Sequence, residues 1–262
     1  MTIPKIELRE VTKTYPGDGE PVRALLGLTL EAFENEITCL VGPSGCGKTT
    51  TLNLVAGFDV PTSGKVLVGG RTVKTPDGTC GFVFQADSVF PWMTIEENVA
   101  YGLRFNGTPK IAAKELVTKY LDMVGLSEFR HRWPRELSGG MRKRVDLARA
   151  YAFNPQVLLL DEPFGSLDVL TKEEMQLLLL RIWRSERKTV LFVTHDVEEA
   201  VFLGHRVAVS APRPGFIKQI FDVPFEMPRE LNLKLTREFL QLRRQITQTL
   251  RSLPVSNRKE SF

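Results

Sequence analysis

The stretch that decides the fold is Glu36–Leu52, with the sequence EITCLVGPSGCGKTTTL. It begins with a short apolar run typical of a buried strand, and a helical pattern follows from about Lys48 to Ala56. Between the two lies a match to G-x-x-x-x-G-K-[ST], in which glycines let backbone N–H groups curl toward phosphate oxygens. The N-terminus of the helix adds partial positive charge. This order predicts nucleotide binding rather than a chance glycine-rich turn, but it does not identify the reaction.

Two side chains of this loop suit a nucleotide with magnesium. Lys48 would reach the β- and γ-phosphates, and the Thr49 hydroxyl would ligate Mg²⁺. A second apolar run, Val157–Leu160, ends in two acids, Asp161 and Glu162, and such strand ends form the ligand-binding edge of an α/β sheet. Asp161 would hold the Mg²⁺ shell, and Glu162 would polarise the attacking water. A surface Asp-Glu pair in a turn is the alternative, and the phosphate loop disfavours it.

A third motif is LSGGM at residues 137–141, which opens a predicted helix that runs through Ala150. A Ser-Gly-Gly sequence at the start of a helix is another N-terminus suited to phosphate. One nucleotide has no need of two separate phosphate sites. We therefore expect Ser138 and its glycines to serve a nucleotide bound by another copy of the chain.

Strands that alternate with helices predict an α/β fold with a parallel sheet. The first forty residues show the alternation of β-strands, at Lys5–Val11 and Ala24–Ala32. The strand before the phosphate loop, the run at Val157–Leu160 and the run at Thr189–Thr194 are apolar throughout, which is typical of fully buried parallel strands. Further strands are expected at Lys65–Val68 and at residues 79–84.

Helical patterns dominate the middle and the end of the chain. Residues from about 87 to 155 are predicted to be mostly helical, and Thr94-Ile-Glu-Glu97 fits a capping box at a helix start. A later helix is expected to open at Thr171. The C-terminal segment has apolar residues at the spacing of an amphipathic helix that packs on the domain, namely Leu235, Phe239, Leu242, Ile246, Leu250 and Leu253.

The composition excludes several classes of protein. The chain has 262 residues, 42% of them hydrophobic and 25% charged, which is ordinary for a globular protein. No apolar run reaches the roughly 18 residues of a membrane-spanning helix, and the N-terminus lacks an apolar signal region, so we expect a cytoplasmic protein. Cys39, Cys46 and Cys80 are too few and too irregularly spaced for a disulfide framework or a zinc site. Residues 228–262 hold eight Lys or Arg and three Glu, which indicates a solvated helix face rather than a nucleic-acid partner.

Together the motifs resemble those of the ATP-binding cassette (ABC) ATPases over residues 5–220. The features that carry the resemblance, in chain order, are Tyr15, the loop at Gly42–Thr49, Gln85 after a strand, the LSGG sequence, the acidic strand, Ser166-Leu167-Asp168, and His195 after the last buried strand. The resemblance implies an α/β fold with a RecA-like P-loop NTPase core, an antiparallel β-subdomain and an inserted helical subdomain. It implies an ABC ATPase domain at residues 1–222, with the helical subdomain at about 87–155, and a C-terminal helical tail at 223–262.

The resemblance also implies ATP hydrolysis, with ATP and Mg²⁺ bound. Tyr15 would stack on adenine, Gln85 would touch Mg²⁺ and the attacking water, and His195 would contact the γ-phosphate. The implied catalytic residues are Lys48, Gln85, Glu162 and His195, and the implied metal ligands are Thr49, Gln85 and Asp161. The implied nucleotide-binding residues are Tyr15, Gly42, Pro43, Ser44, Gly45, Cys46, Gly47, Lys48, Thr49, Thr50, Ser138, Gly139, Gly140 and Asp168.

Three of these residues would act between two copies of the chain. By resemblance, Ser138 and Gly140 grip the γ-phosphate of the partner's ATP, and Asp168 bridges the dimer. The residue after the signature is often Gln in the family, whereas here it is Met141, which cannot donate a hydrogen bond. We assign Met141 no binding role and interpret it as a marker of a subfamily.

Other cassette and P-loop proteins fit less well. DNA-repair cassettes carry a long coiled coil between the phosphate loop and the signature, whereas Lys48 and Asp161 are only 113 residues apart here. Translation-type cassettes need two ATPase units in one chain, and this chain has one. Exporters usually carry fused membrane spans, and an unrelated P-loop kinase or GTPase would lack the signature.

Two stretches resemble the nitrate, sulfonate and taurine importers. One is Phe90-Pro91-Trp92 with Glu97-Asn98-Val99 after it, and the other comprises residues 195–200 and 211–215. Modest departures are Cys80, where relatives often have a basic residue, and Lys143, where they often have Gln. The resemblance implies the ATPase subunit of an importer for a small anion, peripheral on the cytoplasmic face of the inner membrane. Its implied partners are a second copy in a homodimer, transmembrane permease subunits and an extracytoplasmic substrate-binding protein.

The importer interpretation also predicts a docking surface. Phe90, Trp92 and Met93 lie in a predicted loop just before a capped helix. Exposed aromatic residues that cluster in a loop mark an interface more often than chance does. We therefore expect this loop to contact the permease, although it could instead fold back on the helical segment.

Overall fold

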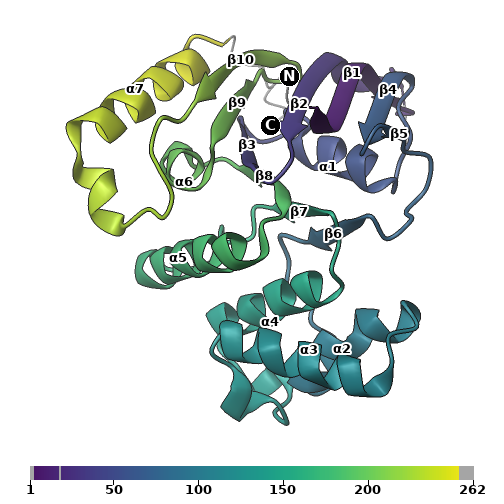
Figure 1. Cartoon of the computed structure of the whole chain (residues 1–262). Coiled ribbons are helices and arrows are strands. Elements are labelled where there is room, and N and C mark those ends of the chain that lie inside the picture. The colour runs from purple at the N-terminus through teal and green to yellow at the C-terminus, as the bar shows by residue number, and fades with distance from the viewer. Residues whose placement is uncertain (1–2, 18, 254–262) are drawn as a thin grey trace. The chain divides into compact units, whose positions relative to one another are not determined.

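The computed structural model describes residues 3–17 and 19–253, which form two compact units. The first unit combines the residues up to Asp77 with those from Thr189 onward, and the second comprises Gly78–Lys188. Figure 1 shows both, with the strands of the first unit in purple, blue and green and the helices α2, α3 and α4 of the second in teal. The described helices include none that is long and apolar enough to cross a membrane.

The first unit contains an antiparallel sheet of four strands. Their spatial order is β2 (Val22–Phe33), β1 (Pro4–Tyr15), β4 (Ser63–Val68) and β5 (Arg71–Thr72). The alternating pattern seen in the sequence reflects burial, since Leu28 and Leu30 are buried while Thr29 between them is exposed. The β character expected of the first forty residues is confirmed.

The first unit also contains parallel strands that carry the phosphate loop. Strand β3 (Ile37–Val41) pairs in parallel with β8 (Thr189–Thr194) on one side and with β9 (Arg206–Ser210) on the other. Strand β10 (Ile217–Asp222) extends this sheet by antiparallel pairing with β9. Every residue of β3 and β8 is buried, which explains why the sequence of both strands is mostly apolar, with threonine as the polar residue in each.

Two helices of the first unit follow strands of that sheet. Helix α1 spans Lys48–Ala56, with the bounds expected from the sequence, and both of its caps are glycines in the left-handed conformation. Helix α6 spans Val197–Leu203, and Asp196 caps it by accepting hydrogen bonds from the backbone N–H groups of the first turn. Helix α1 thus follows β3 after the phosphate loop, and α6 begins three residues after the last residue of β8.

The C-terminal segment forms the expected amphipathic helix, with one correction. Helix α7 (Arg237–Arg251) buries Phe239 and Ile246 completely, and Arg243 forms a 3.0 Å ion pair with Glu198 of α6. Leu235 is 81% exposed because it lies in η3 (Leu231–Leu235), before the cap of α7, so its assignment to the packed face was wrong. Arg258 and Lys259 of the basic tail lie outside the described residues.

The second unit has two parallel strands, β6 (Cys80–Val83) and β7 (Val157–Asp161), and four α-helices in the described part of the chain. The helices are α2 (Ile95–Phe105), α3 (Lys110–Met123), α4 (Gly139–Ala152) and α5 (Val169–Glu186), with the short segments η1 (Ser127–Phe129) and η2 (Pro134–Glu136) before α4. The helical character expected between residues 87 and 155 is confirmed.

The starts of helices α2 and α5 can be compared with those predicted from the sequence. The capping box at α2 is present, since Thr94 Oγ1 accepts from the N–H of Glu97 and the Glu97 carboxylate accepts from the N–H of Thr94. Helix α5 begins at Val169, not at Thr171 as expected. The cap is Asp168, whose carboxylate accepts hydrogen bonds from both the N–H and the hydroxyl of Thr171.

Candidate nucleotide site

The phosphate loop owes its shape to glycines. Gly45 and Gly47 have φ values of +78° and +92°, which residues with a side chain rarely adopt. A Cβ atom at Gly47 would lie 2.4 Å from Cδ2 of Leu25, so space as well as backbone conformation requires glycine there. The N-terminus of α1 has no side-chain cap, which leaves its first N–H groups suited to an anion. These features fit a nucleotide phosphate.

Lys48 lies over its own loop. Its side chain is largely buried, and Nζ donates to the carbonyl oxygens of Gly42 (3.0 Å) and Pro43 (3.2 Å). The ammonium group is therefore inside the curl of the loop, where a phosphate group would be close to it. Thr49 and Thr50 follow in the first turn of α1, the former exposed and the latter half-buried.

Gly215, which is distant in sequence, packs against the phosphate loop. Gly215 donates from its N–H to the carbonyl of Ala24 (2.8 Å) and accepts from the N–H of Leu26 (3.0 Å). A Cβ atom at Gly215 would lie 2.0 Å from the carbonyl oxygen of Cys46 in the loop. Sequence reasoning marked residues 211–215 only by resemblance and gave Gly215 no structural role.

Tyr15 lies in a polar cluster of the first unit. Its hydroxyl donates to Asp59 Oδ2 (2.9 Å), and Lys13 Nζ lies 4.8 Å from the ring centroid while it donates to Asp59 Oδ1 (2.5 Å). Burial raises the pKa of Asp59, but the hydrogen bonds from Lys13, the N–H of Val60 and Tyr15 outweigh it, so the net pKa is lowered. Sequence reasoning missed Lys13 and Asp59, because a charged pair 46 residues apart leaves no local pattern.

The first unit also brings His195 to the same sheet edge as the phosphate loop. In the parallel pair β3–β8, Val41 is in register with Thr194. Gly42 and the exposed His195 are the next residues of the two strands, so both lie at the carboxyl edge, where ligands bind in such folds.

The second unit arranges its own residues in the same way. In the parallel pair β6–β7, Val83 is in register with Leu160, so Gln85 and the acids Asp161 and Glu162 follow at one sheet edge. Asp161 is buried, whereas Gln85 is exposed. Glu162 has a φ of +42°, a value that is rare for a residue with a side chain and that often marks functional sites.

The signature lies beside Asp168 within the second unit. Ser138 caps α4, its Oγ accepting from the N–H of Met141 (3.2 Å). A Cβ atom at Gly140 would lie 2.6 Å from Cγ2 of Thr171, and Thr171 is the residue whose hydroxyl donates to Asp168 (2.6 Å). The starts of α4 and α5 are thus adjacent, and a side chain at position 140 would require Thr171 to shift.

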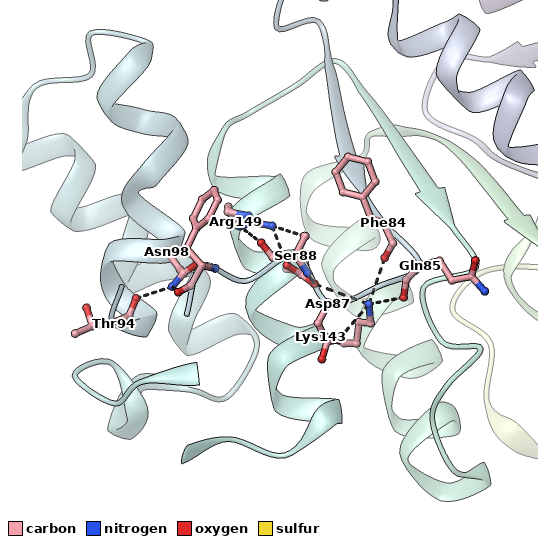
Figure 2. A network of polar contacts seen from close by, with 10 residues as sticks. Phe84, Gln85, Asp87, Ser88, Thr94, Asn98, Lys143 and Arg149 are labelled. Atoms are coloured by element: carbon pink, nitrogen blue, oxygen red, sulfur yellow. Dashed lines mark hydrogen bonds and ion pairs between the residues drawn. The ribbon is translucent and has the colours of Figure 1, made fainter. Parts of the chain in front are cut away.

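The loop between β6 and α2 is held by side chains from α2 and α4 (Figure 2). Asn98 is fully buried, and its Nδ2 donates to the carbonyls of Phe90, Met93 and Thr94 at 3.0–3.1 Å. Its Oδ1 accepts from the N–H of Phe90 (2.8 Å). Asn98 was noted in the sequence only by resemblance, and its role in shaping the loop was missed.

The aromatic residues of this region form a row on the second unit. Ring centroids are 5.5 Å apart for Phe90 and Trp92, 4.6 Å for Phe90 and Tyr101, and 5.1 Å for Tyr101 and Phe105. Trp92 and Phe105 are 68% and 73% exposed, whereas Phe90 is half-buried with Arg149 over its ring. We call Phe90, Trp92, Tyr101 and Phe105 the aromatic row.

The site residues inferred from the sequence therefore fall into two groups. Tyr15, the phosphate loop and His195 belong to the first unit, while Gln85, Asp161, Glu162, the signature and Asp168 belong to the second. Each unit orders its own group with local strand register and helix caps. Binding and hydrolysis of a nucleotide suit the features found here, which are the glycines, the buried acid at a strand end and the uncapped helix start.

Known proteins resemble the chain over most of its length. A family model described as ABC transporter matches residues 25–165. An ABC transporter ATP-binding protein of Methanocaldococcus jannaschii is 45% identical over 247 residues, which is 94% of this chain and 91% of the relative. A taurine import ATP-binding protein of Roseobacter denitrificans is 48% identical over 79% of this chain and 78% of its own. A nitrate import ATP-binding protein of Synechocystis is 44% identical over 89% of each chain.

A solved structure resembles the fold as well. It is an ATP-binding cassette determined as a dimer in a post-hydrolysis state with ADP and Pi, and it shares 32% identity with a TM-score of 0.74. The match covers 84% of this chain and 100% of that chain. The P-loop NTPase fold with an antiparallel subdomain, expected from the sequence, is confirmed.

Proposed function

The chain belongs to the ABC transporter family as the ATP-binding, ATP-hydrolysing subunit of an importer, and we propose that a homodimer of it drives uptake of a small anion through a membrane permease. The observation that carries the ATPase function is the phosphate loop, with its left-handed glycines and buried Lys48 at an uncapped helix start. Residues 1–222 would form the ATPase domain, with the helical subdomain at about 87–155, and 223–262 the C-terminal tail.

We assign the phosphate loop to the binding of ATP. The loop from Gly42 to Thr50 would bind the phosphates, with Lys48 on the β- and γ-phosphates, and Tyr15 would stack on adenine. Lys13 lies over the ring of Tyr15, which supports adenine on the opposite ring face. Thr49, Gln85 and Asp161 provide the oxygen atoms that Mg²⁺ prefers. A bound Mg²⁺ would neutralise charge on the phosphates.

Hydrolysis would depend on Glu162. Its carboxylate follows the buried strand β7, and the left-handed backbone at this residue supports an orientation fixed by the fold. We assign it the role of general base that takes a proton from the attacking water. Gln85 would orient that water, and His195 would contact the γ-phosphate.

We propose that two copies share each ATP. Ser138, Gly139 and Gly140 form a second anion-suited helix start, and Asp168 lies beside it through Thr171. The structural relative was solved as a dimer. A mixture of Lys48→Ala and Ser138→Arg chains would then hydrolyse ATP, although neither chain does so alone. Full activity that is independent of protein concentration would contradict the shared site.

The aromatic row is the surface that we assign to the permease. Trp92 and Phe105 expose large apolar side chains, and a cluster of such side chains on the surface often marks an interface with another protein. Relatives named as taurine and nitrate import proteins support an importer rather than an exporter or a DNA-repair cassette. The same names support a small anion as the solute. We also propose an extracytoplasmic substrate-binding protein as a further partner. The chain would lie on the cytoplasmic face of the inner membrane.

The importer proposal is tested by Trp92→Ala in the presence of the cognate permease. We expect ATP affinity of the isolated chain to be unchanged, co-purification with the permease to be lost, and ATP-driven uptake into vesicles to fall to background. Trp133→Ala is the matched control, because Trp133 is a partly exposed tryptophan of the same unit outside the aromatic row. Normal co-purification and uptake by the Trp92 variant would contradict docking at the aromatic row.

A further inference from the structure

The second unit contains a buried lysine that no nucleotide role explains. Lys143 lies on α4, five residues after Ser138, and its side chain is only 2% exposed. Burial of an ammonium group is costly unless its three N–H donors are all satisfied. The groups that accept hydrogen bonds from Lys143 therefore indicate the structural role of this buried charge.

Those partners are in the Gln85 loop. Nζ of Lys143 donates to the carbonyl oxygens of Phe84 (3.2 Å) and Gln85 (2.8 Å), and it lies 3.3 Å from Oδ1 of Asp87. Figure 2 shows the ammonium group among these backbone atoms, with the amide of Gln85 pointing away from Lys143. The lysine thus holds the main chain of Gln85 and leaves its side chain available.

Neighbouring contacts tie the same loop to α4. Arg142 Nε donates to Asp87 Oδ2 (2.8 Å), and Arg149 donates to the carbonyl of Ser88 (2.8 Å). Asp146, fully buried on α4, accepts from the hydroxyl of Ser88 (2.8 Å) and lies 3.9 Å from Lys143. Three cationic side chains of one helix therefore bind four of the five loop residues between Phe84 and Ser88.

This arrangement connects two parts of the proposed site. Helix α4 begins at the signature residue Ser138, and Gln85 is the residue assigned to the attacking water. Buried charge-assisted hydrogen bonds are stiff, because breaking one leaves a desolvated group without a partner. A displacement of α4 would move the backbone of Gln85 with it.

We propose that Lys143 is a positioning residue for ATP hydrolysis, which holds the Gln85 backbone at a fixed place relative to the signature helix. The inference rests on the proposed ATPase function and on the assignment of Gln85. Lys143 touches no substrate in this account and acts only through Gln85. A small misplacement of a group that orients water lowers the rate of the chemical step and leaves binding intact.

The test compares Lys143→Met, which keeps the length of the side chain but has no donor, with the wild-type chain. We expect kcat for ATP hydrolysis to fall about 10-fold, with ATP affinity unchanged. Lys143→Gln, whose amide can still donate to one carbonyl, is expected to recover part of the rate. Lys119→Met is the matched control, because Lys119 is paired with Glu186 elsewhere in the same unit, and it is expected to have normal kcat.

A double-mutant cycle separates positioning from general destabilisation. In a Gln85→Ala background, Lys143→Met is expected to cause no further loss of kcat, since the residue through which it acts has been removed. An equal loss in both backgrounds, or a loss of ATP affinity that matches the loss of kcat, would overturn the inference. If Lys143→Met does not fold, Lys143→Gln takes its place in the cycle with the same two outcomes.

The failures of the two proposals are distinguishable. A wild-type chain without ATP hydrolysis would contradict the proposed function and the inference together. Normal hydrolysis by wild type with normal kcat for both Lys143 variants would contradict the inference alone.

Discussion

The phosphate loop of the first unit and the Gln85 loop of the second are held in different ways. The phosphate loop is shaped by its own backbone, with left-handed glycines and a lysine that bonds two carbonyls of the same loop. The Gln85 loop takes its shape from side chains of α2 and α4, chiefly Asn98 and Lys143 (Figure 2). The first loop is therefore shaped mainly by residues of its own, whereas the second is attached to two helices by hydrogen bonds.

Substitution in the phosphate loop is expected to have the largest effect. In Gly47→Ala, the added Cβ meets Leu25 at 2.4 Å and the φ of +92° becomes strained. We expect ATP affinity to fall about 100-fold, which corresponds to ~2.7 kcal/mol. Isothermal titration of ATP measures the loss, and circular dichroism shows whether the variant is folded.

The control for Gly47 is Gly70→Ala. Gly70 also has a positive φ, +75°, but a Cβ atom there meets nothing within 4 Å. This variant carries backbone strain outside the loop and is expected to bind ATP normally. Equal affinity losses in the two variants would show that strain, rather than the shape of the phosphate loop, controls binding.

The Gln85 loop is expected to respond in stability rather than in affinity. Asn98→Ala removes four hydrogen bonds from a fully buried side chain. We expect it to lower the free energy of unfolding by about 2 kcal/mol while ATP affinity is retained. Asn106→Ala, which removes one exposed hydrogen bond of 3.4 Å, is the control and is expected to change little. Loss of ATP affinity in Asn98→Ala would show that the two loops do not act separately.

The adenine platform is expected to have a smaller effect on affinity. Tyr15→Ala removes the aromatic face and is expected to weaken ATP binding about 10-fold, because stacking of a base on an aromatic ring contributes roughly 1–3 kcal/mol. Tyr15→Phe keeps the ring and loses the hydrogen bonds of the hydroxyl with Asp59 and Thr50, so it is expected to stay close to wild type. Tripolyphosphate, which has no base, would bind all three chains equally. A loss of tripolyphosphate binding in Tyr15→Ala would refute adenine stacking as the cause.

The smallest effect is expected at the cap of α2. Thr94→Ala removes the acceptor for the N–H of Glu97 and is expected to cost about 1 kcal/mol of stability. The backbone N–H of Thr94, which alanine keeps, and the Thr94 hydroxyl both donate to the Glu97 carboxylate and lower its pKa. The part of the cost that comes from the hydroxyl is therefore present at neutral pH and is lost as pH falls through the folded-state pKa of Glu97. Urea unfolding at pH 7 and at acidic pH measures the difference, and a cost that does not shrink on acidification would contradict the carboxylate's part in the cap.

The same contrast explains what the sequence could predict. The bounds of α1 and the capping box of α2 depend on neighbouring residues, and both were predicted. Lys143, Asp59 and Gly215 contact residues of the proposed site across 44 or more positions, so no local pattern marked their roles. In the sequence, Lys143 was noted only as a departure from related proteins. The structure shows that its ammonium group donates to the main chain of the Gln85 loop.

The start of a helix was harder to predict where two neighbouring residues could each act as its N-cap. Both Asp168 and Thr171 are good cap residues, and the sequence pattern favoured the later one. In the structure Thr171 instead donates to Asp168, which places the helix start two residues earlier. Leu235 shows the same limit, since its spacing fits α7 but the helix begins after it.

The most direct test of the account is the rate of phosphate release by Glu162→Gln, with ATP affinity measured on the same preparation. The side chain keeps its size but cannot accept a proton from water, so the account predicts normal ATP binding and hydrolysis lowered by about 10²–10⁴. Normal hydrolysis by this variant would contradict the assignment of Glu162 and the catalytic site built around it.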